Sequence, residues 1–88
     1  MAYSVGVERK AQKQIARLSS EMQDRIEAAL GALAYDPRPP GCVKLTGRDD
    51  YRVRVGDYRI LYDIEDDRLT VVVVKVGDRK EIYKGKIR

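Results

Sequence analysis

The chain has 88 residues, of which 43% are hydrophobic and 36% are charged, with a formal net charge of +4. This length fits one small domain over residues 1–88, and the composition is that of a globular protein rather than a disordered one. The longest purely apolar run, residues 71–74, is far shorter than the roughly 20 residues that span a membrane. The N-terminal residues lack the apolar segment of a signal peptide, so we expect a cytoplasmic protein.

The cysteine and histidine content excludes several kinds of site. Cys42 is the only cysteine, so an intrachain disulfide or a cysteine zinc cluster is impossible. Histidine is absent, which excludes serine–histidine catalysis, cysteine–histidine catalysis and histidine-ligated metals. There is also no glycine-rich loop of the kind that cradles nucleotide phosphates. We therefore expect no metal and no cofactor, and any proton transfer must use Asp, Glu, Lys, Tyr or Arg.

The positive charge is unevenly distributed along the chain. Residues 1–37 hold five basic and five acidic side chains, so their net charge is zero. Residues 38–88 hold 13 basic and nine acidic side chains, and therefore carry the whole +4. This bias favours a polyanionic partner, either a nucleic acid or an acidic protein.

The first part of the chain predicts a short strand followed by two helices. Apolar residues alternate over residues 3–7, as in a strand, and residues 8–18 are rich in helix formers. Ser20 with Gln23 has the spacing of a capping box, which predicts the start of a second helix that continues to about Tyr35. Because the break between the helices is short, we expect a helical hairpin, which the prolines after residue 36 bring to an end.

The remainder of the chain predicts antiparallel strands. Residues 43–45 fit a short edge segment, and residues 51–55 and 58–64 alternate cleanly on either side of a Gly56-Asp57 turn. Asp66 and Asp67 are predicted to form a similar turn into a strand over residues 69–76. The fold class is α+β: an N-terminal strand, a helical hairpin and a three-strand antiparallel meander, with the helices packed on one face of the sheet.

The register of the hairpin at residues 51–64 predicts an arginine-rich surface. A two-residue turn places Arg54 opposite Arg59 and Arg52 opposite Leu61, and residues directly opposite share a face. Leu61, Val72 and Val74 are expected on the same face, while the tyrosines and aliphatic residues alternate onto the face that the helices cover. Like charges directly opposite are destabilising, whereas an anion bound across the pair would reverse the sign. The alternative is an ordinary solvated face whose arginines pair with nearby aspartates.

The end of the chain adds a second group of candidate residues. Arg79 follows the last strand, and Tyr83 could stack on a base, move a proton, or simply pack the tail against the sheet. The lysines around them predict diffuse attraction to phosphates.

The segment YRVRVGDYRILY at residues 51–62, followed by VKVGDR at residues 74–79 and by Tyr83, resembles the RelE/ParE toxin superfamily of toxin–antitoxin systems. The resemblance covers essentially the whole chain and implies the βααβββ fold described above. It implies a cognate antitoxin as partner, in a toxin–antitoxin hetero-oligomer. In the RelE branch, such toxins are ribosome-dependent endonucleases that cut mRNA in the decoding site. In the ParE branch, the same fold poisons DNA gyrase.

We favour the RelE branch, with the ribosome and mRNA as further partners. The alternatives are a ParE-like gyrase inhibitor without RNase activity and an inactive module that only binds an antitoxin. The resemblance suggests Arg59 as stabiliser of the phosphorane, Arg79 as charge clamp or acid, and Tyr83 as base or stacking partner. The full set of implied residues is catalytic Arg54, Arg59, Arg79 and Tyr83, with Arg52, Lys75, Lys80 and Lys84 binding RNA.

Two departures from the RelE pattern matter. Lysines commonly stand where this chain has Arg52 and Arg54, and one of them is assigned an acid–base role; arginine keeps the charge but is a poor base because its pKa exceeds about 12, so a lysine general base at position 54 is lost. Many relatives carry histidine where Asp78 stands, and an acid there would add negative charge near the expected site.

Overall fold

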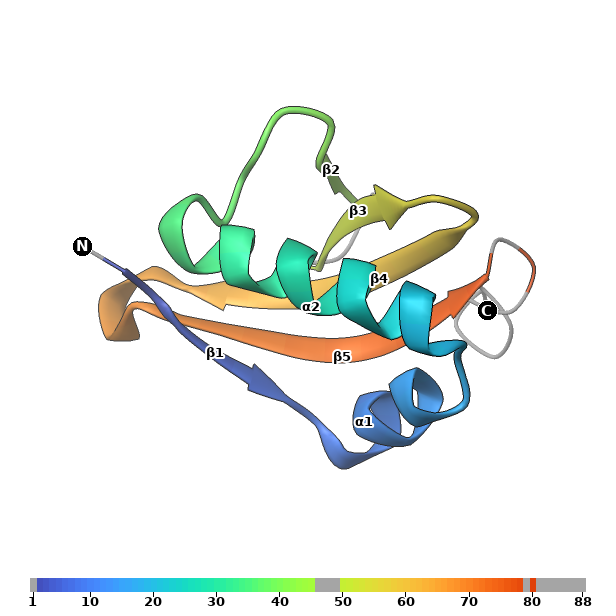
Figure 1. Ribbon diagram of the computed structural model, residues 1–88. Coiled ribbons are helices and arrows are strands. Elements are labelled where there is room, and N and C mark those ends of the chain that lie inside the picture. The colour runs from blue at the N-terminus through green and yellow to red at the C-terminus, as the bar shows by residue number, and fades with distance from the viewer. Residues whose placement is uncertain (1, 46–49, 79, 81–88) are drawn as a thin grey trace.

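The structure, a computed structural model, describes residues 2–45, 50–78 and 80. Its centre is a sheet with the strand order β1-β5-β4-β3-β2, which carries two helices (Figure 1). In chain order the elements are β1 (Ser4–Val7), α1 (Arg9–Ala16), α2 (Ser20–Tyr35), β2 (Val43–Lys44), β3 (Tyr51–Val55), β4 (Tyr58–Glu65), a 3₁₀ turn (Asp66–Arg68) and β5 (Thr70–Asp78).

The strands form the expected antiparallel meander with one addition at each edge. β3, β4 and β5 pair antiparallel in succession, and the short β2 pairs antiparallel with β3. β1 pairs in parallel with the first half of β5, with Val5 opposite Val71. The sequence predicted β1 but not its partner, because parallel pairing across more than 60 residues leaves no local signal.

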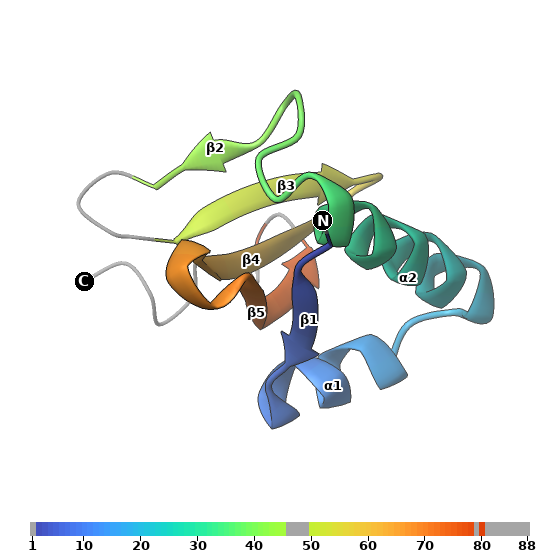
Figure 2. The same ribbon diagram turned by 90° about the vertical axis from the view of Figure 1, so that its left-hand side faces the viewer.

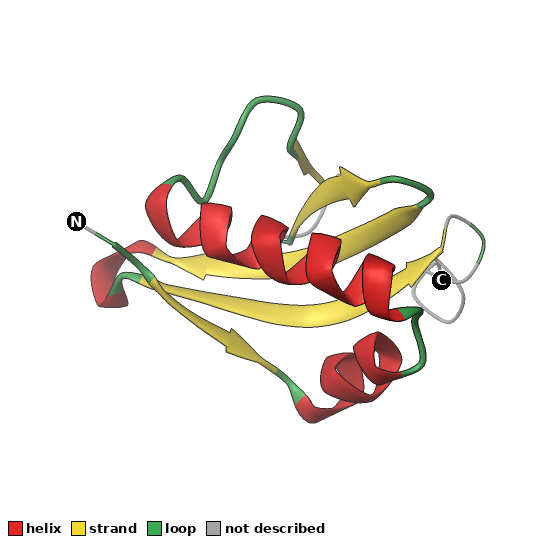
Figure 3. Cartoon of the chain, viewed as in Figure 1, coloured by secondary structure: helices red, strands yellow, loops and turns green. Residues whose placement is uncertain are grey.

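The helices cover one face of the sheet, as predicted (Figures 2 and 3). α2 contacts β1 and β3, and α1 contacts β5. The side chain of Gln14 fixes α1 to the sheet, because its Oε1 accepts a hydrogen bond from the backbone N–H of Val76 at 2.8 Å. The buried core between helices and sheet consists of Ala11, Ile26, Leu33, Val53, Ile60, Tyr62, Val71, Val73 and Val76.

The start of α2 lies one residue earlier than the capping-box prediction. Ser19 is the N-cap residue, with extended backbone angles, and its Oγ accepts a hydrogen bond from the N–H of Met22 at 3.2 Å. The side chain of Gln23 donates instead to the carbonyl of Leu18 at 2.9 Å. The prediction of Ser20 as cap is therefore wrong, since either of two adjacent serines could serve and the chain enters the helix through the first.

The turn between β4 and β5 also differs from the prediction. Asp66 and Asp67 belong to a 3₁₀ turn, and Leu69 closes it with a left-handed φ of 49°, so that Glu65 pairs with Thr70. Further along the two strands, the register shifts by one residue between Leu61 and Tyr62. The two-residue turn predicted here is wrong, and β5 runs from Thr70 to Asp78 instead of over residues 69–76.

No helix in the described part of the chain is both long enough and apolar enough to cross a membrane.

Candidate functional site

The β3–β4 hairpin has the register that the sequence predicted. Val55 pairs with Tyr58, Arg54 with Arg59, and Arg52 with Leu61. Gly56 opens the turn with φ 59°, and no positive φ occurs at Asp57. This is the pattern of a turn with glycine at its first central position, which matches the twist of the flanking strands. The local sequence therefore sets which side chains share a face.

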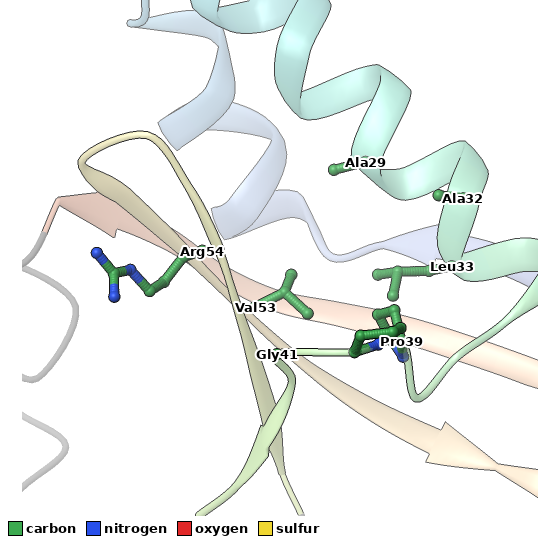
Figure 4. A pocket seen from close by; sticks show the side chains of 8 residues that line it. Ala29, Ala32, Leu33, Pro39, Gly41, Val53 and Arg54 are labelled. Carbon is green, nitrogen blue, oxygen red and sulfur yellow. The ribbon is translucent and has the colours of Figure 1, made fainter.

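The two faces of this hairpin differ sharply in character. Val53 is 8% exposed and Ile60 is fully buried, both on the face under the helices. Figure 4 shows Val53 pointing toward Leu33 of α2, whereas the Arg54 side chain extends on the other side of β3. Arg54 is exposed, and Arg52 and Arg59 are partly exposed. We call the outer surface formed by Arg52, Arg54 and Arg59 the arginine face.

Arg54 and Arg59 repel each other in the absence of a bound anion. Their positions next to the turn's closing pair form a non-hydrogen-bonded pair, in which the Cα atoms are only about 4.5 Å apart. Neither arginine forms an ion pair with another described residue. Among the described residues, no aspartate forms an ion pair with either arginine, so the pairing that the solvated alternative included is not seen at these two positions. Guanidinium groups so placed can hold a phosphate through bidentate hydrogen bonds.

Arg59 has no side chain opposite it on β5. Its partner across β4 and β5 is Gly77, which has no side chain to cover the outer surface. Asp78 pairs with Tyr58, so alternation places its carboxylate on the opposite face from Arg59. The Asp78 carboxylate accepts a hydrogen bond from the backbone N–H of Lys80 at 2.9 Å. Asp78 therefore does not add its charge directly to the arginine face.

The predicted site residues fall into three groups. Arg52, Arg54 and Arg59 are brought together as expected. Lys75 lies opposite Leu61 but is only 7% exposed, and Lys80 is exposed just beyond β5. The predictions for Arg79, Tyr83 and Lys84 lie outside the described residues. The apolar floor is confirmed in part, because Leu61 is fully buried and Val72 and Val74 are half-buried.

A polar cluster that sequence reasoning missed lies at the other end of the sheet. The Arg38 guanidinium donates to both carboxylate oxygens of Asp66, at 3.2 and 2.9 Å, and to the hydroxyl of Tyr51 at 3.2 Å. The hydroxyl of Tyr3 donates to the same carboxylate at 2.7 Å. These bonds hold the pKa of Asp66 below its usual value, with Arg38 as the larger cause, and raise the pKa of Tyr3. The partners are 28 and 63 residues apart, so no spacing rule would have paired them.

Two stacked tyrosines connect this cluster with the core. The rings of Tyr51 and Tyr62 stack with centroids 5.9 Å apart, and the Arg38 guanidinium lies 5.2 Å from the centre of the Tyr51 ring. The buried hydroxyl of Tyr62 donates to the carbonyl of Pro37 at 2.7 Å, and burial is the main cause that raises its pKa. The cluster therefore fixes the proline segment after α2 against the sheet.

A hollow of about 350 Å³ lies between α2 and the segment before β2 (Figure 4). Its lining is largely apolar, with Leu33 and Val53 at its floor. It lies mainly on the helix side of β3, and Arg54 is the one residue that it shares with the arginine face. Its full lining is Ala29, Ala32, Leu33, Pro39, Pro40, Gly41, Val53 and Arg54.

Among the described residues, no three acidic or cysteine side chains are grouped so that they could hold a metal ion. The charge available to a bound anion at the arginine face comes from the arginines themselves.

Comparison with known proteins gives similar chains over nearly the full length. The mRNA interferase toxin RelE of Escherichia coli K12 is 28% identical over 93 aligned residues, which cover 100% of this chain and 97% of that protein. The toxin RelG of Mycobacterium tuberculosis is 32% identical over 88 residues, which cover 96% of this chain and 99% of that protein.

Solved structures share the fold. The archaeal RelE–RelB complex from Pyrococcus horikoshii matches with a TM-score of 0.82 at 28% identity, covering 92% of this chain and 99% of that one. The isolated Escherichia coli RelE toxin matches with a TM-score of 0.78 at 27% identity, covering 98% and 96%. The family model described as "ParE toxin of type II toxin-antitoxin system, parDE" matches residues 5–83. The chain therefore belongs to the ParE toxin family of type II toxin–antitoxin systems, within which it is similar to RelE and RelG toxins.

Proposed function

We propose that this toxin is an endoribonuclease that cuts mRNA in the decoding site of the ribosome and so inhibits translation. The observation that supports this most is the pair Arg54 and Arg59, directly opposite each other on the sheet face turned away from the helices, with no ion pair to another described residue. The similarity to relatives named as mRNA interferases, over the full length of this chain, also supports this function.

The reaction would be an attack of the ribose 2′-oxygen on the adjacent phosphorus. The bond from the 2′-oxygen to phosphorus forms as the bond to the 5′-oxygen breaks, leaving a 2′,3′-cyclic phosphate and a 5′-hydroxyl. A base takes the 2′-hydroxyl proton and an acid supplies one to the leaving oxygen. The phosphorane between these steps carries two negative charges, so fixed cations around it lower the barrier. We propose that Arg54 and Arg59 supply this charge, with no metal or cofactor.

The remaining roles follow from position and residue type. Arg52 lies two residues along β3 from Arg54, so it would hold the message backbone beside the reacting phosphate. Lys75, Lys80 and Lys84 would add attraction to the RNA. We propose Arg79 as charge clamp or acid and Tyr83 as base or stacking partner, which leaves Arg54 with a role that needs charge rather than proton transfer.

A requirement for the ribosome fits the shape of the site. The arginine face is one side of a sheet and does not enclose its substrate. A free single-stranded message has many conformations, and only a few of them align its 2′-oxygen with the scissile bond. Fixing that geometry contributes strongly to such reactions. We propose that the ribosome holds the message in place, and hence that the toxin acts in the cytoplasm.

We also propose that a cognate antitoxin binds this chain in a hetero-oligomer. The similar RelE chains of Pyrococcus horikoshii and Escherichia coli were solved as complexes with RelB. The apolar hollow beside α2 is suited to an apolar segment of such a partner, and its acidic side chains would partly neutralise the basic surface. Affinity for the antitoxin should then fall as salt increases.

The test is cleavage of a defined mRNA by purified toxin, with and without ribosomes that carry this message and an empty decoding site. We expect cutting only in the presence of the ribosomes. Cutting of free RNA at the same rate would overturn the ribosome requirement, and no cutting of either substrate would overturn the nuclease assignment.

Inhibition of DNA gyrase is the second candidate, and the ParE name of the matching family model favours it. A supercoiling assay with purified gyrase separates the two. Inhibition of supercoiling without any cleavage of ribosome-bound mRNA would establish this second function in place of the first.

A further inference from the structure

The turn of the β3–β4 hairpin lies against an arginine of α2. A Cβ built on Gly56 would be 3.3 Å from Nη1 and 3.5 Å from Nη2 of Arg25, and 3.5 Å from Cε of Met22. The Arg25 guanidinium therefore lies over the side of Gly56 where any other residue would carry a side chain. Figure 1 shows this turn at the same end of the sheet as the first half of α2.

Glycine at position 56 meets two requirements at once. Its φ of 59° lies in the left-handed region, which other residues rarely adopt. The missing Cβ also lets the Arg25 guanidinium approach the backbone of the turn closely. A flat guanidinium suits this position better than the ammonium of lysine, which is a compact and strongly hydrated point charge. The contact between α2 and the turn therefore depends on the residue type on both sides.

Ion pairing does not account for the direction of the Arg25 side chain. Glu21 stands four residues earlier on α2, which is the favourable order for a pair of opposite charges on a helix. Asp57 is the neighbour of Gly56 in the turn and is exposed. Arg25 nevertheless forms no ion pair with either carboxylate or with any other described residue. The guanidinium instead lies against the turn.

This turn ends the hairpin that carries the arginine face. Val55 pairs with Tyr58 to close the turn, and the next pair is Arg54 with Arg59. β2 pairs only with the first two residues of β3, so β3 is an edge strand where it approaches the turn. A support under the turn would therefore limit how far the two guanidinium groups of the pair can move apart.

We propose that Arg25 is a positioning residue for message cleavage. By lying against Gly56, it fixes the end of the hairpin so that Arg54 and Arg59 stay at the separation that a phosphate between them requires. This inference rests on the proposed nuclease function. Arg25 acts through the hairpin and does not touch the message. A misplacement of about 1 Å can cost on the order of a hundredfold in rate, so a contact outside the arginine face can control activity.

The first experiment measures kcat and KM for cleavage of ribosome-bound mRNA by Arg25→Met. Methionine keeps a long unbranched side chain and a good helix propensity, but it lacks the guanidinium. We expect kcat to fall by about tenfold to a hundredfold with KM little changed. Arg68→Met is the matched control, because it removes the same charge from an exposed position in the turn at the other end of β4. Its kcat should equal that of the parent.

Arg25→Lys separates positioning from a general attraction of RNA. Lysine restores the charge but not the flat group that lies over Gly56. We expect Arg25→Lys to cut nearly as slowly as Arg25→Met. A raised KM in Arg25→Met that lysine restores, with kcat unchanged, would overturn the inference, because Arg25 would then act through its charge alone.

Amide hydrogen exchange tests the same contact without any cleavage. The amides of Val55 and Tyr58, which close the turn, should exchange on the order of fivefold faster in Arg25→Met than in the parent, because the turn opens locally more often. The amides of Ile60 and Val73 belong to fully buried residues of the sheet. They should exchange at the parent rate, which shows that the rest of the fold is intact.

The two experiments distinguish a failure of this inference from a failure of the nuclease function. A parent protein that does not cut mRNA would overturn the nuclease function, and hydrogen exchange would still decide whether Arg25 supports the hairpin. Unchanged exchange at Val55 and Tyr58 would overturn the inference. An active parent whose kcat is unaltered by Arg25→Met would overturn it as well.

Discussion

Arg54 on β3 lies directly opposite Arg59 on β4, on the sheet face turned away from the helices. Neither has an ion-pair partner among the described residues, so the folded chain bears their mutual repulsion. A phosphate bound between the two side chains would attract both guanidinium groups and so offset their repulsion. Under the proposed function, this pair would cost the free protein stability and would help it to bind the message.

Arg54→Glu should make the protein more stable and less active. The new carboxylate would lie opposite the Arg59 guanidinium, and a cross-strand pair of opposite charge contributes roughly 0.2–1 kcal/mol. It would also repel the message phosphate. Urea unfolding measures the first effect and ribosome-dependent cleavage the second. A variant that is both active and more stable would show that Arg54 does not contact the RNA.

Tyr62→Phe should destabilise the fold. The Tyr62 side chain is fully buried, and its hydroxyl is 2.7 Å from the Pro37 carbonyl, so the variant leaves that carbonyl without its partner. The expected loss is about 1–3 kcal/mol in the free energy of unfolding. Tyr35→Phe is the control, since Tyr35 is 80% exposed and should tolerate the change. Equal stability of the two variants would contradict the role given to this hydrogen bond.

Asp66→Asn should remove part of the acid sensitivity of folding. Arg38 and Tyr3 lower the pKa of the Asp66 carboxyl in the folded state below its ordinary value of 3.8. The carboxylate therefore contributes stability that is complete above about pH 4 and is lost as the pH falls through the lowered folded value. The stability difference between parent and variant should shrink over that interval. A difference that is constant down to pH 2 would show that the carboxylate is not stabilised by these contacts.

Gly56→Ala and Gly31→Ala should change stability in opposite directions. Gly56 has φ 59°, and an added Cβ would lie 3.3 Å from Nη1 of Arg25, so the expected loss is about 1–2 kcal/mol. Gly31 is in the middle of α2, where an added Cβ meets nothing within 4 Å, so alanine should stabilise by about 0.5–1 kcal/mol. Denaturant unfolding of both variants measures whether the free energy of unfolding falls for Gly56→Ala and rises for Gly31→Ala.

Local features of the sequence were sufficient to predict which residues form the arginine face. The Gly56-Asp57 turn determines the register, and strict alternation then determines which residues face outward. The order of strands and helices followed in the same way from periodicity and from the prolines after α2. These signals act within a few residues, where backbone geometry leaves little choice.

The features that the sequence did not predict depend on distant contacts or on choices between similar neighbours. The parallel pairing of β1 with β5 and the bonds from Arg38 to Asp66 join residues far apart in the chain. Ser19 and Ser20 are equivalent as caps until the path of the preceding loop is known. The left-handed Leu69 is unusual for a branched apolar residue, so a two-residue turn was the simpler expectation.

The most direct test of the central claim is the chemistry of the cut ends. Ribosomes programmed with a defined message would be treated with the parent protein and with Arg59→Ala, and both ends of each product would be mapped. We expect the parent to leave a 5′-hydroxyl and a 2′,3′-cyclic phosphate, and Arg59→Ala to cut at least about a hundredfold more slowly. Products with a 5′-phosphate, or an Arg59→Ala variant that cuts as fast as the parent, would contradict the account.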